Sequence, residues 1–227
     1  MNKITFCILL AIAALCVVPS CKKDKTNTVK TTPIDSVIYP DYMVLKPGNY
    51  WIYEDYMLDS ANGAAHALGT FDSSYVTNDT IINGQTYHSY WDLSEASPGG
   101  GYYVSYLRDS LGYTVTNYGG ILFSSDDFTT IFYSRQVYNP TAGIIDTVTV
   151  NLQMGFKDSS MTVPVGTFVT STMRQIWYFP PPVYSFGPTR EYDHTYARGV
   201  GMIKETTKFY TNSPEVYEKR LVRFHLQ

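Results

Sequence analysis

Cysteine is scarce in this chain of 227 residues: there are three, and none follows position 21. The sequence beyond Cys21 therefore excludes disulfide bonds and thiol catalysis, and a domain built from it depends on its own hydrophobic core. Charge is scarce as well, since charged residues make up 16% of the chain and the net charge is −3. So weak a charge argues against a nucleic-acid partner.

Catalytic motifs are also missing. The chain contains neither a Gly-x-Ser-x-Gly nucleophile elbow nor a His-Glu-x-x-His zinc motif, and its four histidines occur singly. We therefore expect no enzyme activity, no cofactor and no metal site. Asp126 and Asp127 are interpreted as a helix cap or a turn, because they lack the spaced oxygen ligands of a calcium-binding loop.

One pair of carboxylates keeps a hydrolase as an alternative. Glu191 and Asp193 would share one face of a strand, where they could act as an acid and a base. Arg190 and Arg198 lie nearby in the sequence. An exposed ion-pair cluster is therefore the preferred interpretation of these residues.

Long apolar runs are confined to the N-terminus. After Lys3, residues 4–18 carry no charge, a length that suits a signal peptide and is short for a bilayer-spanning helix of about 20 residues. The run leads into Val-Pro-Ser-Cys, ending at Cys21, which resembles the bacterial lipoprotein signal. The resemblance implies removal of residues 1–20 and attachment of acyl chains such as palmitate to Cys21. A plain secretory signal and an uncleaved membrane helix are the alternatives.

These features divide the chain into three parts. Residues 1–20 are the predicted signal peptide, residues 21–40 the lipid-bearing cysteine and a flexible, threonine-rich tether, and residues 41–227 a single folded domain. We expect the lipid to anchor the protein to the outer membrane of the cell envelope. The sequence leaves open whether the domain faces the periplasm or the cell surface.

The predicted domain has the composition and the periodicity of β-strands. The chain holds 21 tyrosines, 11 phenylalanines and 3 tryptophans, and its apolar residues alternate with polar ones. Val148, Val150, Leu152 and Met154 fall on one strand face, and Val222, Phe224 and Leu226 fall on one face of another strand with Leu221, Arg223 and His225 opposite. Asn83-Gly84 and Leu111-Gly112 separate such runs as hairpin turns do. The pattern predicts an all-β fold, either an antiparallel sandwich or a partly open barrel of about ten strands.

Three short motifs carry a family resemblance. Leu-Lys-Pro-Gly-Asn-Tyr-Trp-Ile-Tyr occupies residues 45–53, Thr-Val-Pro-Val-Gly-Thr-Phe residues 162–168, and Tyr-Ala-Arg-Gly-Val-Gly-Met-Ile-Lys residues 196–204. Their order resembles that of uncharacterised envelope lipoproteins of Bacteroidetes-type bacteria. The resemblance implies a lipid-anchored, β-rich domain and no catalytic residues. The glycines of the third motif are interpreted as a bulge or a close backbone approach rather than as a phosphate loop.

Aromatic clusters give the clearest indication of binding. Residues 87–91 and 177–184 place aromatic side chains on both faces of their strands, so rings that do not enter the core are candidates for ligand contact. The candidates are Tyr90, Trp91, Trp177, Tyr178 and Tyr184. They favour a glycan or an envelope protein as the partner. The preferred alternative is that both faces are covered and the rings belong to the core.

Five sites match a modification pattern of an aspartate, a hydroxyl residue and a small or aliphatic residue. The pattern is similar to the O-glycosylation signal of exported proteins in the same bacterial group. The hydroxyl residues are Ser36, Ser60, Thr80, Ser110 and Thr147. The same pattern also arises where Ser- and Thr-rich strands follow aspartates in turns.

Together, these observations predict a lipid-anchored outer-membrane lipoprotein whose non-catalytic β-domain binds or scaffolds at the cell envelope. A glycan-binding surface lipoprotein that uses exposed aromatic residues is one alternative. A hydrolase of envelope polymers or polysaccharides is the other.

Overall fold

The computed structural model describes residues 38–94, 101–139, 146–179, 188–208 and 216–227, all within the compact unit Ile38–Gln227. These residues form thirteen antiparallel strands and no helix. Because this unit holds every described strand and the whole described core, it contains what the fold needs to form by itself. The all-β fold class is confirmed. The predicted signal peptide and nearly all of the tether lie outside the described residues.

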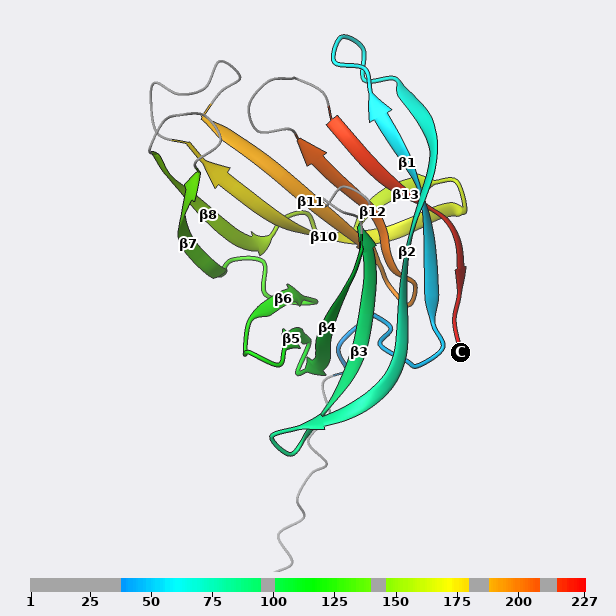
Figure 1. The fold of residues 1–227 in the computed structure, drawn as a ribbon, viewed down its shortest axis with the longest axis vertical. Coiled ribbons are helices and arrows are strands. Elements are labelled where there is room, and N and C mark those ends of the chain that lie inside the picture. The colour runs from blue at the N-terminus through cyan, green and yellow to red at the C-terminus, as the bar shows by residue number, and fades with distance from the viewer. Residues whose placement is uncertain (1–37, 95–100, 140–145, 180–187, 209–215) are drawn as a thin grey trace, which may run out of the picture. The chain divides into compact units, whose positions relative to one another are not determined.

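Figure 1 shows the arrangement of the strands. In chain order they are β1 (Tyr50–Leu58), β2 (Ala65–Ile82), β3 (Gln85–Ser94), β4 (Gly101–Ser110), β5 (Tyr113–Thr116), β6 (Ile121–Ser124), β7 (Ile131–Asn139), β8 (Asp146–Met154), β9 (Ser159–Val163), β10 (Gly166–Tyr178), β11 (Thr189–Ala197), β12 (Gly201–Lys208) and β13 (Val216–His225).

One sheet contains all thirteen strands. The order is β6-β5-β4-β3-β2-β1-β13-β12-β11-β10-β8-β7, with β9 paired to β10. The sheet curves so far that β6, at one end, lies against β7, β8 and β10 at the other end (Figure 1). Of the two predicted architectures, the structure is therefore the partly open barrel. A short strand such as β6 raises the count above the predicted ten, since four residues give too weak an alternation to recognise.

The hydrophobic core fills the concave side of this sheet. Its largest fully buried side chains include Trp51, Tyr53 and Phe123. The predicted alternation of β8 is confirmed, since Val148, Val150 and Met154 are all buried.

The C-terminal strand differs from its predicted pattern at one residue. Leu221 was expected opposite the apolar face, yet it is fully buried in the core. The reason is a bulge: Ile52 pairs with Arg223 whereas Tyr53 pairs with Leu221, so Val222 is an extra residue. The bulge turns Leu221 inward, while Arg223 beyond it stays exposed.

The first and third sequence motifs pack against each other. The Trp51 indole donates a hydrogen bond to the Val200 carbonyl at 2.5 Å, and the Tyr53 hydroxyl donates one to the Met202 carbonyl at 3.1 Å. Gly201 has a φ of +109°, and a Cβ there would lie 2.8 Å from the Trp51 ring nitrogen. The glycine is thus required by a close approach, which confirms the structural interpretation of the third motif.

The predicted hairpin turns are both present. Asn83 and Gly84 have φ values of 51° and 75°, and Leu111 and Gly112 have 52° and 83°. Positive φ at both central residues is the type I′ geometry that matches the twist of the flanking strands. These turns fix the pairing of β2 with β3 and of β4 with β5.

Candidate functional site

A row of aromatic side chains crosses the outer face of the sheet. It runs over five neighbouring strands, from β13 through β1, β2 and β3 to β4. His225 pairs with Tyr50, Tyr50 with Tyr75, and Tyr75 with Trp91. Tyr102 on β4 follows on the diagonal, because it pairs with Leu93, two residues along from Trp91. We call His225, Tyr50, Tyr75, Trp91 and Tyr102 the outer aromatic row.

The rings of this row contact one another in two groups. The Tyr75 and Trp91 rings are stacked with centroids 6.0 Å apart and planes 2° apart. Tyr102 meets both rings edge-on, at 5.5 Å and 6.3 Å. Tyr50 and His225 form the second group, stacked at 5.6 Å. Offset stacks and edge-on contacts are the favourable geometries for aromatic pairs, so the rings hold one another in place.

Several rings of the row are exposed to solvent, and a hydrogen bond fixes the orientation of one of them. Tyr50 is 37% exposed and Tyr102 49% exposed, while Trp91 is half-buried. The Trp91 indole donates a hydrogen bond to the Thr77 hydroxyl at 3.1 Å, which fixes the direction of its ring. Arg223, next along the same face from His225, is also exposed and adds a hydrogen-bond donor beside the rings.

A bulge in β2 creates the central stack. The Asn83-Gly84 turn pairs Asp79 with His88, but beyond the bulge Val76 pairs with Tyr90. This shift of one residue brings Tyr75 opposite Trp91. Without the bulge, the turn register would place an aspartate opposite Tyr75.

The predicted ligand-contact aromatics are dispersed. Of those that the structure describes, Trp91 alone belongs to the outer aromatic row. Tyr90 faces the interior, with its ring 6.1 Å from that of Trp51 among the side chains that pack on the core. Tyr184 lies outside the described residues.

The two candidates on β10 lie on opposite faces of that strand. Trp177 is half-buried, and its ring lies 5.9 Å from that of Tyr192. Tyr178 is 41% exposed. The sequence alone did not indicate Tyr50, Tyr75, Tyr102 and His225, because their contacts depend on pairing between strands.

The concave face contains a second feature that the sequence analysis missed. Four carboxylates surround one ammonium group, and we call Asp55, Asp72, Asp92, Glu205 and Lys219 the interior acidic cluster. Lys219 forms an ion pair with Asp72, and its nitrogen lies 3.9 Å from Glu205. Asp55 and Asp72 are each 1% exposed and Lys219 is 4% exposed. The signal that could have found this cluster is a charge at an inward-facing strand position, such as Asp55 two residues after the buried Tyr53.

Hydroxyl groups donate hydrogen bonds to two carboxylates of this cluster. The Thr70 hydroxyl donates to Asp55 at 2.7 Å, and the Ser74 hydroxyl donates to Asp92 at 2.6 Å. Asp72 Oδ1 has no hydrogen-bond partner among the described residues. Among those residues no group of acidic, histidine or cysteine side chains has the geometry of a metal site.

Burial dominates the electrostatics of the cluster. It raises the pKa of Asp55 and the pKa of Asp92 above the usual range of a carboxyl group. Burial alone would lower the pKa of Lys219, but Glu205 and Asp72 more than offset it, and that pKa is raised. The ammonium is therefore held charged, while two of the surrounding carboxyl groups are biased toward their protonated form.

Glu191 and Asp193 form an ion-pair cluster on the outer face. Arg174 on β10 is their cation: its Nε lies 2.8 Å from Asp193 Oδ1, and a terminal nitrogen lies 3.5 Å from Glu191 Oε2. The same guanidinium lies 4.7 Å from the centre of the Phe156 ring. The ion-pair interpretation is confirmed, but the cation is Arg174 on the neighbouring strand, and the cluster is half-buried rather than exposed.

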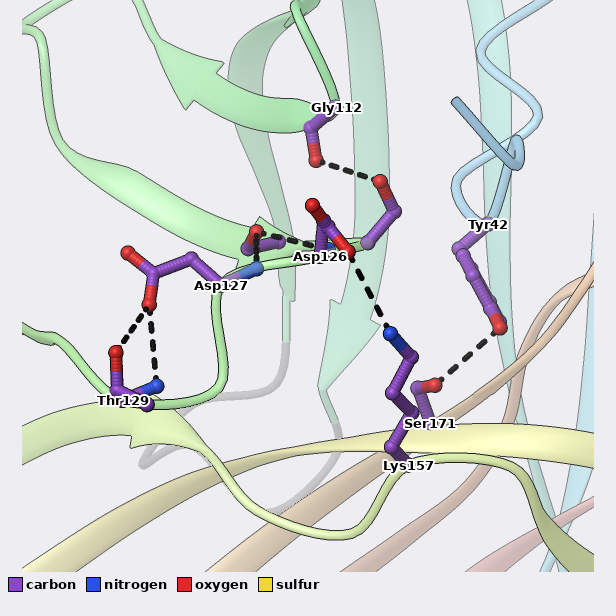
Figure 2. Close-up of polar contacts among 9 residues, drawn as sticks. Tyr42, Gly112, Asp126, Asp127, Thr129, Lys157 and Ser171 are labelled. Carbon is purple, nitrogen blue, oxygen red and sulfur yellow. Dashed lines mark hydrogen bonds and ion pairs between the residues drawn. The ribbon is translucent and has the colours of Figure 1, made fainter. Parts of the chain in front are cut away.

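Asp126 and Asp127 form a turn between β6 and β7 (Figure 2). The Asp127 carboxylate accepts hydrogen bonds from the Thr129 hydroxyl and amide at 3.1 Å, and Asp126 lies 3.5 Å from the Lys157 nitrogen. Hydrogen bonds from Thr130 and Thr129 lower the pKa of Asp127 to about 2. These contacts confirm the turn interpretation.

The predicted glycosylation sites occupy different surroundings. Ser60 and Thr147 are exposed, Thr80 and Ser110 are half-buried, and Ser36 lies outside the described residues. Cys21 lies outside them as well. Within the described residues, no helix has the length and the apolar character that a bilayer-spanning segment requires.

Comparisons with known proteins support the fold. No protein-family model matches the sequence, and no curated protein matches it. A solved structure of a proposed lipoprotein from Parabacteroides distasonis is similar, with a TM-score of 0.51 and 12% identity, over 83% of this chain and 100% of that one. A proposed exported protein from Bacteroides fragilis with a YmcC-like fold gives a TM-score of 0.44 and 12% identity, over 82% and 99% of the chains. The chain therefore shares its all-β fold with the Parabacteroides protein.

Proposed function

We propose that the protein is a lipid-anchored outer-membrane lipoprotein whose non-catalytic β-domain binds glycans at the cell envelope through the outer aromatic row. The signal that ends at Cys21 supports the anchor. The name of the Parabacteroides structure, a proposed lipoprotein, is in keeping with it. The anchor confines the domain to ligands of the envelope and its surroundings.

The stacked Tyr75–Trp91 pair with Tyr102 against it is the observation that carries the proposal. Sugar rings present apolar C–H faces and polar edges. Flat, partly exposed tyrosine and tryptophan rings match this combination, since each has an apolar body and one hydrogen-bonding group. Because the rings are held by one another and by Thr77, little conformational entropy is lost on binding.

The dimensions of the row favour an extended ligand. Its five strands are separated by four spacings of about 4.8 Å, so the row is about 19 Å long. It is also shallow, since the rings project from the outer face of a continuous sheet. A long and shallow surface suits an oligosaccharide chain better than a single sugar in a pocket.

Binding of the unit Ile38–Gln227 to an array of envelope and dietary glycans tests the proposal. Tyr102→Ala removes an exposed ring that meets both stacked rings, and we expect it to weaken glycan binding about tenfold. Tyr118→Ala is the matched control, because Tyr118 is 91% exposed and lies outside the row. Equal binding by the two variants, or no glycan bound by the parent unit, contradicts the proposal.

A further inference from the structure

The two ends of the sheet border a half-open cavity of about 320 Å³ between β6 and β7. Strands β8 and β10 complete its wall. The apolar lining comes from three strands and consists of Ile121, Leu122, Phe132, Val150 and Leu152. None of these strands carries a residue of the outer aromatic row, so the cavity is a separate site.

The walls of the cavity are held by packing on both sides. Phe132 of β7 meets the Tyr113 ring of β5 edge-on at 6.1 Å. Leu122 and Leu152 belong to the side chains that pack against the hydrophobic core. The cavity is therefore built into the place where the sheet stays open, and does not depend on one exposed side chain.

Two polar groups lie at this apolar cavity. Gln175 contributes an amide, and Arg135 contributes a guanidinium. Arg135 is exposed and lies 5.7 Å from the centre of the Tyr133 ring, and it forms no ion pair with any described carboxylate. A guanidinium without a carboxylate, beside an apolar hollow, matches a ligand with an anionic end and an apolar chain.

We propose that this cavity binds a single-chain anionic amphiphile, with its carboxylate or phosphate on Arg135 and its chain against Leu122, Phe132 and Leu152. A methylene group fills about the volume of a water molecule, ~30 Å³, so the cavity accommodates a chain of about ten carbons. Gln175 donates a second hydrogen bond to the head group. The site is independent of glycan binding and stands whether or not the outer aromatic row binds sugars.

A series of fatty acids tests the cavity by its size. Binding of hexanoate, octanoate, decanoate and dodecanoate to Ile38–Gln227 is measured by calorimetry without detergent. We expect the affinity to rise about fourfold for each added methylene until the chain reaches about ten carbons, and then to level off. A ten-carbon lysophosphatidic acid is measured alongside, and the tighter of the two ten-carbon ligands identifies a free acid or a lipid phosphate as the source.

Substitution of Arg135 tests the head-group contact. We expect Arg135→Ala to weaken decanoate binding at least about tenfold and to leave decanol binding unchanged. Misfolding would reduce both, so this difference keeps the test informative. Arg198→Ala, at another exposed arginine, is the matched control and is expected to bind decanoate as the parent does.

A photoreactive decanoate locates the ligand without any variant. We expect its chain-end diazirine to label peptides of β6, β7 or β8. Three results would overturn the proposal. They are no binding by any of these amphiphiles, an equal loss of affinity for decanoate and decanol in Arg135→Ala, and labelling confined to other strands.

Discussion

Replacement of Lys219 by methionine tests what stabilises the interior of the sheet. Lys219 is the one cation of the interior acidic cluster, and it is 4% exposed beside Asp72, which is 1% exposed. Methionine keeps most of the volume of the side chain and removes its charge. The variant leaves the four carboxylates of the cluster with no ammonium among them.

The expected loss of stability is large. Breaking a buried ion pair by removing one partner costs about 3–5 kcal/mol, because the other charge stays buried without compensation. Solvent screens this pair little, since both side chains are almost completely buried. Against a typical unfolding free energy of about 5–15 kcal/mol, the variant loses a substantial part of its stability at neutral pH.

The loss should also depend on pH. Burial already raises the pKa of Asp55 and of Asp92 above the ordinary carboxyl value of 3.8, and loss of the ammonium should raise both pKa values further. Between 3.8 and these raised values the folded state binds more protons than the unfolded state, so stability falls as pH rises. We therefore expect the deficit of Lys219→Met to be small near pH 4 and to grow toward neutral pH.

Urea unfolding of the variant and its parent, at about pH 4.5 and 7.5, measures both effects. Lys46→Met is the matched control, because Lys46 is exposed, and it should change stability by less than about 0.5 kcal/mol. Adding Asp72→Asn to Lys219→Met should restore part of the loss. A cost below about 1 kcal/mol at pH 7.5, or a deficit that shrinks as pH rises, would contradict this expectation.

Three further predictions concern other parts of the chain. Gly201→Ala should lower the unfolding free energy by about 1–3 kcal/mol, because it adds a methyl group against Trp51 at a φ of +109°; unchanged urea unfolding would be inconsistent with this packing. Cys21→Ser should move the protein from the membrane fraction to the aqueous fraction, and retention in the membrane would disprove the anchor. Ser60→Ala and Thr147→Ala, at the two exposed modification sites, should each lower the intact mass by one glycan, and an unglycosylated parent mass would rule the modification out.

Local patterns made much of the fold predictable. The hairpins at Asn83-Gly84 and Leu111-Gly112 follow from residues that tolerate positive φ, and the inward face of β8 follows from strict alternation. Such signals lie within a few residues of one another. They were sufficient for the all-β fold class and for the turns.

The candidate site could not be predicted from the sequence because it depends on two β-bulges. The bulge in β13 turned Leu221 inward, and the bulge in β2 placed Tyr75 against Trp91. A bulge shifts the register by one residue and leaves almost no trace in composition. The outer aromatic row depends on these registers across five strands, which is why Trp91 was found and its neighbours were not.

The interior acidic cluster was missed for a different reason. Asp55, Asp72 and Lys219 are residues of charged types. In a strand whose polar and apolar residues alternate, such residues are ordinarily assigned to the solvent face. Their burial depends on strands far apart in sequence that bring opposite charges together. Their pairing is visible only in the folded sheet.

The location of a bound glycan is the decisive test of the outer aromatic row as a binding site. A crystal structure of Ile38–Gln227 with the tightest-binding oligosaccharide of the array shows where the sugar lies. We expect sugar rings stacked on Tyr75, Trp91 and Tyr102, with the chain crossing the strands. An oligosaccharide bound elsewhere on the domain, with this row uncovered, would contradict it.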